Sequence, residues 1–148
     1  MTTISAFMTG DHRACDAQLA DLESHVEASR WPQARTAWAA FGAAMRCHFR
    51  REEEILFLAF ERATGGGGGP TYVMRMEHEQ MRAAFGQLDV AVRAEDKKRV
   101  LALSESLMVL IQQHNMKEEQ ILYPMAEQLV EDGDRVVGEM QALRPESS

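Results

Sequence analysis

One short segment occurs twice in this chain, and this repeat constrains the fold more than any other feature of the sequence. HFRREEEILF begins at His48, and HNMKEEQILY begins at His114; we call the step from position 48 to position 114 the repeat offset. In each copy the histidine precedes a glutamate by one helical turn, at i and i+4, and an Ile-Leu-aromatic run follows. A charged helix can contain one such segment by chance. Two copies, together with further residues at the same offset, indicate a repeated structural unit.

Two further histidines obey the repeat offset. It separates His12 from His78, so His12 precedes His48 by the same interval as His78 precedes His114. The same shift aligns Glu52 with Glu118. Among the five histidines only His25 has no histidine at the corresponding position. The sequence therefore predicts a helical hairpin that is used twice, with an approximate two-fold axis between the copies.

The spacing of apolar residues predicts helices along most of the chain. Pro32 suits the first turn of a helix, and Glu95 or Asp96 suits the cap of another. The segment TGGGGGP at 64–70 fits a flexible connection. The predicted helices cover about 11–28, 32–62, 71–93 and 96–130, and a short C-terminal helix fits 134–143. The fold class predicted is all-α, an antiparallel up-down four-helix bundle, in a single domain spanning residues 1–148.

Charge and hydropathy exclude several classes of partner. The net charge of −7 leaves no basic stripe for nucleic acid, and no stretch approaches the roughly 20 apolar residues that a membrane span needs. The beginning, MTTISAFMTGDH, does not resemble a signal peptide, and Cys15 and Cys47 are too few for a disulfide framework. A cytoplasmic location is expected. The two thiols are also a candidate redox pair.

Helix geometry predicts that the four repeated histidines converge. The path from His12 up to residue 29 is nearly as long as the return path from residue 32 to His48. At about 1.5 Å per residue these rises nearly cancel, so the two imidazoles should lie at one height. The second hairpin repeats this arrangement for His78 and His114. Histidine and glutamate at i and i+4 share one helix face, so four imidazoles and two carboxylates should meet inside the bundle.

Buried carboxylates and imidazoles need a compensating charge, which iron, manganese or zinc can supply. Two glutamates on separate helices could each bridge two metal ions, while one ion with fewer ligands is the alternative. Solvated helix faces are the ordinary interpretation of REEE at 51–54 and KEE at 117–119, but they leave the common offset of the histidines unexplained. The Glu-x-x-His pairs of ferritin-like bundles and the HExxH string of zinc proteases are absent from the sequence.

The pattern His, His-x-x-x-Glu, His, His-x-x-x-Glu resembles the hemerythrin-like (HHE cation-binding) domains. The resemblance covers about residues 5–130 and includes EEQILYP, in which Pro124 should kink the fourth helix. It implies two iron ions with an oxo or hydroxo bridge and two bridging carboxylates, with manganese or zinc as alternatives. Carried over by position, the terminal ligands are His12, His48, His78 and His114, and the bridging ligands are Glu52 and Glu118.

The sequence also departs from the oxygen-carrying hemerythrins. Those proteins follow a five-histidine pattern, in which an additional histidine stands where this chain has Met74. Their fourth helix has an Asp five residues after its histidine, whereas this chain has Glu118 four residues after His114. The departure implies an open position at one iron for water, substrate or a side chain such as Tyr72 or Tyr123.

Two functions remain after this comparison. One is a binder or sensor of dioxygen, nitric oxide or iron, and the other is an enzyme that consumes hydrogen peroxide in a catalase-like way. A small molecule is the expected partner in both, and a homo-oligomer is left open. Several polar residues beside the ligands are candidates for orienting the imidazoles, and the sequence does not choose among Glu53, Glu77, Glu79, Gln113 and Glu119.

Overall fold

The computed structural model describes residues 2–66 and 69–146, and most of these are helical. The four longest helices are α1 (Ile4–Glu27), α2 (Trp31–Arg50), α4 (Pro70–Arg93) and α5 (Lys97–Lys117). Two of them continue through a π-helical segment into a further α-helix, namely α2 through η1 (Arg51–Leu56) into α3 (Phe57–Thr64), and α5 through η2 (Glu118–Leu122) into α6 (Tyr123–Leu129). The last helix is α7 (Gly133–Ala142). The described residues contain no strand, so the all-α prediction is confirmed.

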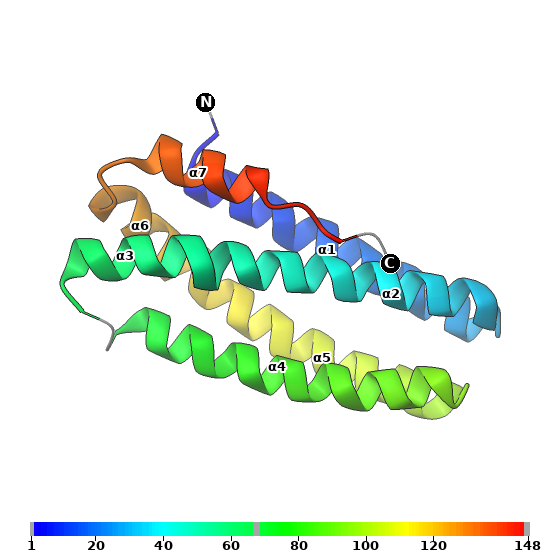
Figure 1. Ribbon diagram of the computed structural model, residues 1–148. Helices are drawn as coiled ribbons and strands as arrows, with labels where there is room; N and C mark the ends of the chain where they lie inside the picture. The colour runs from blue at the N-terminus through cyan, green and yellow to red at the C-terminus, as the bar shows by residue number, and fades with distance from the viewer. Residues whose placement is uncertain (1, 67–68, 147–148) are drawn as a thin grey trace.

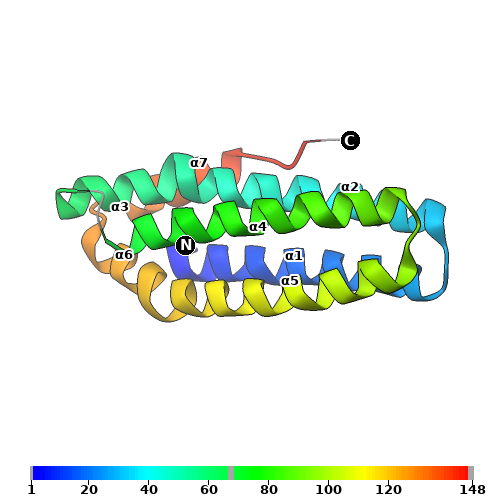
Figure 2. The same cartoon turned by 90° about the horizontal axis from the view of Figure 1, so that it is seen from below.

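The long helices lie side by side along most of their length (Figures 1 and 2). Helix α1 packs against α2 and α5, and α4 packs against α5 and α2. Helix α7 lies along the side of the bundle, next to the first part of α1, and packs against α1 and η1 (Figure 1). Within the described residues, none of the helices is both long enough and apolar enough to cross a bilayer.

The first helix begins earlier than the sequence predicted. It starts at Ile4 rather than near Asp11, because the Thr3 side chain accepts a hydrogen bond from the Ala6 amide and caps the helix. Ile4 and Met8 are also buried, so the added turns have an apolar face to pack.

The internal repeat extends to the turns between paired helices. Ser29 and Glu95, which are separated by the repeat offset, both have positive φ angles, of 57° and 53°. Asp96, one of the two predicted caps, accepts a hydrogen bond from the Arg99 amide and begins α5. Gly65, with a φ of 80°, ends α3. The predicted connection at 64–70 includes residues 67 and 68, which lie outside the described residues.

We expect Ser29→Gly to stabilise the protein. A left-handed backbone conformation costs a non-glycine residue roughly 1 kcal/mol, so glycine should raise the free energy of unfolding by about 0.5–1 kcal/mol. Ser24→Gly is the matched control, because the same change inside α1 should lower stability by a similar amount. Urea denaturation of both variants measures the effect. An equal loss of stability in both would contradict this account of the turn.

Two apolar clusters form the core, and a polar layer lies between them. One cluster fills the end of the bundle near the Ser29 and Glu95 turns and includes Leu22, Phe41 and Leu107. The other includes Met8, Phe57 and Met140 and is covered by α7. The buried polar residues of the intervening layer are His12, His48, Arg51, Glu52, His78, His114 and Glu118. The apolar clusters therefore shield this layer from water at both ends.

Candidate metal centre

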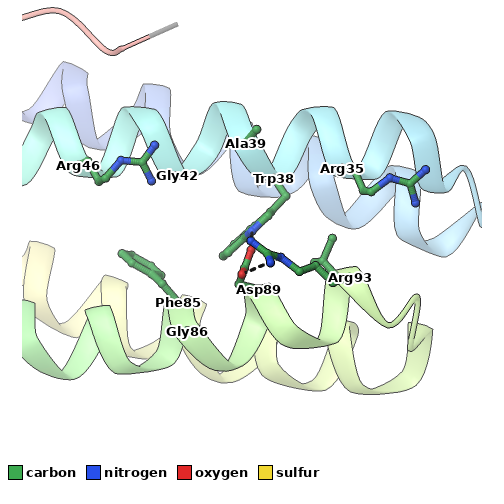
Figure 3. A pocket seen from close by; sticks show the side chains of 10 residues that line it. Arg35, Trp38, Ala39, Gly42, Arg46, Phe85, Gly86, Asp89 and Arg93 are labelled. Carbon is green, nitrogen blue, oxygen red and sulfur yellow. Dashed lines mark hydrogen bonds and ion pairs between the residues drawn. The ribbon is translucent and has the colours of Figure 1, made fainter. Parts of the chain in front are cut away.

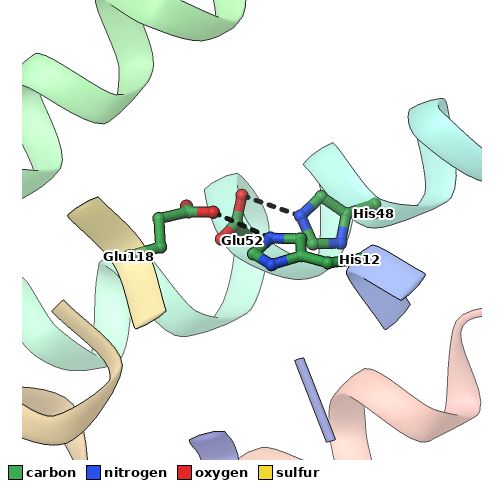
Figure 4. Close-up of side chains that lie close together, drawn as sticks. All are labelled: His12, His48, Glu52 and Glu118. Atoms are coloured by element: carbon green, nitrogen blue, oxygen red, sulfur yellow. Dashed lines mark hydrogen bonds and ion pairs between the residues drawn. The ribbon is translucent and has the colours of Figure 1, made fainter. Parts of the chain in front are cut away.

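The structure brings together all six side chains that the sequence selected as metal ligands. His12 and His48 form one group with Glu52 and Glu118, and one ligand atom from each of the four lies within 4.8 Å of the others (Figure 4). His78 and His114 form a second group of the same kind with the same two glutamates. None of the six is more than 4% exposed. The two glutamates thus belong to both groups, and the histidines are divided into pairs.

The carboxylates of Glu52 and Glu118 each contact an imidazole from the other half of the chain. The Nε2 atom of His12, in the first half, lies 3.0 Å from Oε1 of Glu118 in the second half. The Nε2 atom of His78 lies 3.0 Å from Oε1 of Glu52 in the same way. Each carboxylate therefore faces an imidazole of the opposite half, which is the arrangement expected from the predicted two-fold axis.

Consecutive glutamates hold the same imidazole from both sides. Glu53 accepts a hydrogen bond from Nδ1 of His78 at 2.7 Å, while Glu52 faces Nε2 of that ring. Glu119 lies 2.6 Å from Nδ1 of His12, opposite Glu118. A hydrogen bond at Nδ1 fixes the ring and leaves Nε2 to face the centre, which is how carboxylates orient metal-ligating histidines.

The imidazoles of His48 and His114 are oriented by carboxylates that stand immediately before the other two histidines in the chain. Asp11 accepts a hydrogen bond from Nδ1 of His48 at 2.8 Å, and Glu77 accepts one from Nδ1 of His114 at 2.8 Å. Asp11 was not among the residues predicted to orient the imidazoles. The signal was available in the sequence, because the repeat offset also separates Asp11 from Glu77.

Of the remaining candidates for orienting the imidazoles, neither Glu79 nor Gln113 does so. The Glu79 side chain is 73% exposed and pairs with Arg82. Gln113 is also exposed. The structure thus selects among residues that the sequence left equivalent.

The glutamates lie at π-helical segments that were not predicted from the sequence. Segment η1 begins at Arg51, beside Glu52, and η2 begins at Glu118 itself. π-helical turns are rare and occur often at functional sites. Segment η2 ends at Leu122, just before Pro124, where the sequence predicted a kink in the fourth helix. The first half has Leu58 at the position equivalent to Pro124, so the proline is not the shared cause.

One aromatic position breaks the symmetry of the centre. Phe57 and Tyr123 are equivalent by the repeat offset, and they stack on His78 and His12 with ring centroids 5.7 and 5.6 Å away. The Tyr123 hydroxyl donates to Oε2 of Glu52 at 2.7 Å and lies 3.1 Å from Nε2 of His12. Phe57 has no hydroxyl, so only the His12 side of the centre receives this group.

Tyr72, the other tyrosine considered as an additional ligand, lies elsewhere. It is 56% exposed, and within the described residues it makes no hydrogen bond to the six side chains. Met74 occupies the apolar cluster that also holds Met8, its equivalent in the first half. The structure therefore leaves Tyr123 as the tyrosine that reaches the centre.

The two cysteines are free and buried. Cys15 packs in the first apolar cluster, and burial raises its pKa to about 11. Cys47 donates a hydrogen bond to the Leu143 carbonyl at 3.6 Å, and burial raises its pKa too. Both thiols are thereby kept protonated and poorly nucleophilic, which disfavours the redox-pair hypothesis.

Without a metal ion, protons on the imidazoles balance part of the carboxylate charge in this layer. Burial opposes ionisation of Glu52, but the charge of His48 holds the pKa of that carboxyl well below its usual range. Burial likewise opposes charging of His114, yet the nearby Glu118 carboxylate, 3.3 Å from its Nε2 atom, and the charge of Glu52 raise its pKa to about 9. Burial and the two carboxylates raise the pKa of Tyr123, so its hydroxyl keeps its proton. A bound cation would displace protons from the imidazoles.

A match to a family model identifies the family of this chain. The model of the Hemerythrin HHE cation binding domain matches residues 3–126, which include all six residues of the centre. The chain belongs to the hemerythrin HHE family. A search of the curated proteins and a search of the solved structures found no match.

The donor atoms of this hemerythrin-type centre fit a cation. Within the described residues, three buried atoms of the layer have no hydrogen-bond partner, namely His48 Nε2, His114 Nε2 and Glu118 Oε2. When the imidazoles are neutral, as metal ligands are, the two central and four outer carboxylates carry six negative charges, and among the described residues three cationic side chains pair with them, namely Arg51, Arg82 and Lys117. Buried atoms without partners and an excess of carboxylate charge are both satisfied by metal ions.

Arg51 connects the C-terminal segment to this centre. Its guanidinium pairs with Asp11 at 3.0 Å and donates to the carbonyls of Met140 at 2.9 Å and Leu143 at 2.6 Å. Lys117 is its equivalent in the second half and pairs with Glu77, but it is half exposed. One side of the hemerythrin-type centre is therefore covered by α7, whereas on the other side the equivalent cation, Lys117, is half exposed.

We expect Arg51→Met to destabilise the protein far more than Lys117→Met. The first change leaves Asp11 and two carbonyls without their partner, which should cost about 3 kcal/mol in the free energy of unfolding. The second removes a solvent-screened pair and should cost less than about 1 kcal/mol. Chemical denaturation measures both values. Equal losses would contradict the asymmetry inferred from α7.

Proposed function

We propose that this protein holds two iron ions, each bound by one histidine pair and bridged to the other by Glu52 and Glu118. The observation that carries the proposal is that both four-residue groups share these two glutamates. Imidazole and carboxylate donors suit iron, with manganese and zinc as alternatives. An oxo or hydroxo bridge is part of the proposal, as is an antiparallel up-down four-helix bundle. The side-by-side packing of the long helices supports that architecture.

Metal content and spectroscopy test this assignment. We expect purified protein to contain about two iron ions per chain and a visible charge-transfer band, with a coupled ferric pair in the Mössbauer spectrum. A single high-spin ion, or a stoichiometry near one with any metal, would reject the dinuclear assignment.

The proposed activity is binding of, or reaction with, dioxygen or hydrogen peroxide at this centre. Iron supplies the redox chemistry and an exchangeable coordination position when it is bound. The chain itself orients the ligands and keeps water away. The outer carboxylates fix the imidazole rings, and the apolar clusters on either side exclude bulk water.

A catalase-like conversion of two hydrogen peroxide molecules into water and dioxygen is the second candidate. The position of Tyr123 favours it, because a buried hydroxyl within 2.7 Å of Glu52 can hold a proton where oxygen species react. Oxygen evolution after peroxide addition to iron-loaded protein separates the two. Rapid evolution that is lost in His114→Ala identifies an enzyme, and a stable visible band without turnover identifies a binder or sensor.

The proposal includes the setting expected from the sequence. The partner is a small molecule such as dioxygen, peroxide or nitric oxide rather than nucleic acid or membrane, and the location is cytoplasmic. The net charge of −7 supports the exclusion of nucleic acid. Gel filtration decides whether a homo-oligomer forms.

A further inference from the structure

A groove between α2 and α4 lies outside the metal centre and has the size of a small-molecule site. Its volume is about 560 Å³, within the usual range of ligand pockets. Trp38 on α2 and Phe85 on α4 form its aromatic walls (Figure 3). The groove therefore offers flat apolar surfaces on which a ring system can pack.

Two helical glycines, Gly42 on α2 and Gly86 on α4, line the groove. A Cβ atom at Gly86 would meet nothing within 4 Å, and one at Gly42 would meet only the Arg46 guanidinium, the nearest atom being Nη1 at 3.1 Å. Helix packing therefore requires neither glycine, although each costs about 0.5–1 kcal/mol relative to alanine inside a helix. Their effect is to leave the groove open.

The groove also concentrates positive charge in a chain whose net charge is −7. Arg35, Arg46 and Arg93 line it, against a single carboxylate, Asp89. Asp89 is already engaged, since it accepts from Trp38 Nε1 at 2.9 Å and pairs with Arg93 at 3.0 Å (Figure 3). Arg35 pairs with a glutamate outside the groove.

Arg46 is the cation of the groove that remains for a ligand. Among the described residues, its guanidinium has neither an ion pair nor a hydrogen bond. A guanidinium of this kind can donate two parallel hydrogen bonds to a carboxylate or a phosphate.

We propose that the groove binds a planar aromatic molecule that carries a carboxylate or phosphate group. The ring system packs between Trp38 and Phe85, and the anionic group pairs with Arg46. The binding site is independent of the metal centre, although Phe85 packs on Phe49 at a centroid distance of 6.0 Å and Phe49 stacks on His78 at 4.1 Å. One aromatic ring thus separates the ligand's wall from an imidazole of the centre.

Calorimetric titration of the full-length, metal-loaded protein tests the proposal with two probes, flavin mononucleotide and 2-naphthoate. We expect saturable binding of at least one, and the probe that binds distinguishes phosphate from carboxylate. Riboflavin has the same rings as the first probe without the phosphate, and should bind roughly tenfold more weakly if phosphate is recognised. Inorganic phosphate should bind more weakly still, because it lacks the rings.

Matched variants locate the binding. Gly86→Leu should abolish it by filling the groove, whereas Gly138→Leu, at a helical glycine of α7 with equally open surroundings, should leave it unchanged. Arg46→Gln should weaken binding of the anionic probe roughly tenfold, and Arg99→Gln, an exposed position on α5, should have less than a twofold effect.

Three outcomes would overturn the proposal. The first is no saturable binding of either probe up to roughly 1 mM, the range of the weakest specific sites. The second is binding that Gly86→Leu does not weaken, which places the site elsewhere. The third is a dimer that dissociates in Gly86→Leu, because the groove would then hold a second copy of the chain.

Discussion

Replacing Glu52 with alanine is expected to remove both of the proposed iron ions together. Each of the two ligand groups contains Glu52, so its loss deprives both of a carboxylate and leaves the remaining imidazoles without their bridging charge. We expect bound iron to fall from about two ions per chain to well below one, and the visible band to disappear. His114→Ala should instead affect chiefly the position formed with His78.

Glu54→Ala provides the matched control for this loss. Glu54 lies in the same π-helical segment, and its side chain is 55% exposed and pairs with Arg50. The control removes one carboxylate from η1 without touching the buried layer, so the iron content should stay at about two. Metal analysis of both variants after identical loading checks the prediction. A Glu52→Ala protein that keeps one tightly bound iron would show that the centre is not bridged by this residue.

Stability should follow metal content in the same experiment. Ligands that bind the folded state raise the free energy of unfolding by mass action, by about 4 kcal/mol at a thousandfold excess over the dissociation constant. Chelator treatment should therefore lower the melting temperature of the native protein and of Glu54→Ala. In Glu52→Ala the chelator should have almost no effect.

If the proposed catalase-like activity holds, Tyr123→Phe is expected to lower peroxide turnover roughly a hundredfold without removing iron, because general acid–base groups contribute about 10²–10⁴-fold to rate. The change deletes a hydroxyl that contacts Glu52, Glu118 and His12, and it preserves the ring that stacks on the His12 imidazole. Oxygen evolution and iron content are measured on the same sample. Turnover that matches the native rate would exclude a role for this hydroxyl.

Two further variants sharpen that result. Tyr72→Phe removes a hydroxyl from an exposed tyrosine and should leave turnover unchanged. Phe57→Tyr, introduced together with Tyr123→Phe, moves the hydroxyl to the equivalent position beside His78. If the two halves are chemically interchangeable, the double variant should recover much of the lost activity. Continued inactivity would show that the His12 side alone is the reactive one.

The sequence determined the residues of the centre because its repeat is a local pattern. Helix geometry then predicts which of the repeated residues lie close together. Four histidines and two glutamates at one offset are expected at about one height when the two helices of each antiparallel hairpin are matched in length. The all-α class followed from apolar periodicity for the same reason. Even the turns at Ser29 and Glu95 obey the offset.

Only the tertiary structure decided which residues surround the ligands. Asp11, Glu53, Glu77 and Glu119 could be assigned to particular imidazoles only after the helices were placed against one another, since each pairing joins separate helical segments. The sequence also did not predict three other features of the centre, namely the π-helical segments, the inward position of the Tyr123 hydroxyl and the covering helix α7. These features depend on the rotation of each helix about its axis and on contacts between distant segments, which a periodic pattern does not encode.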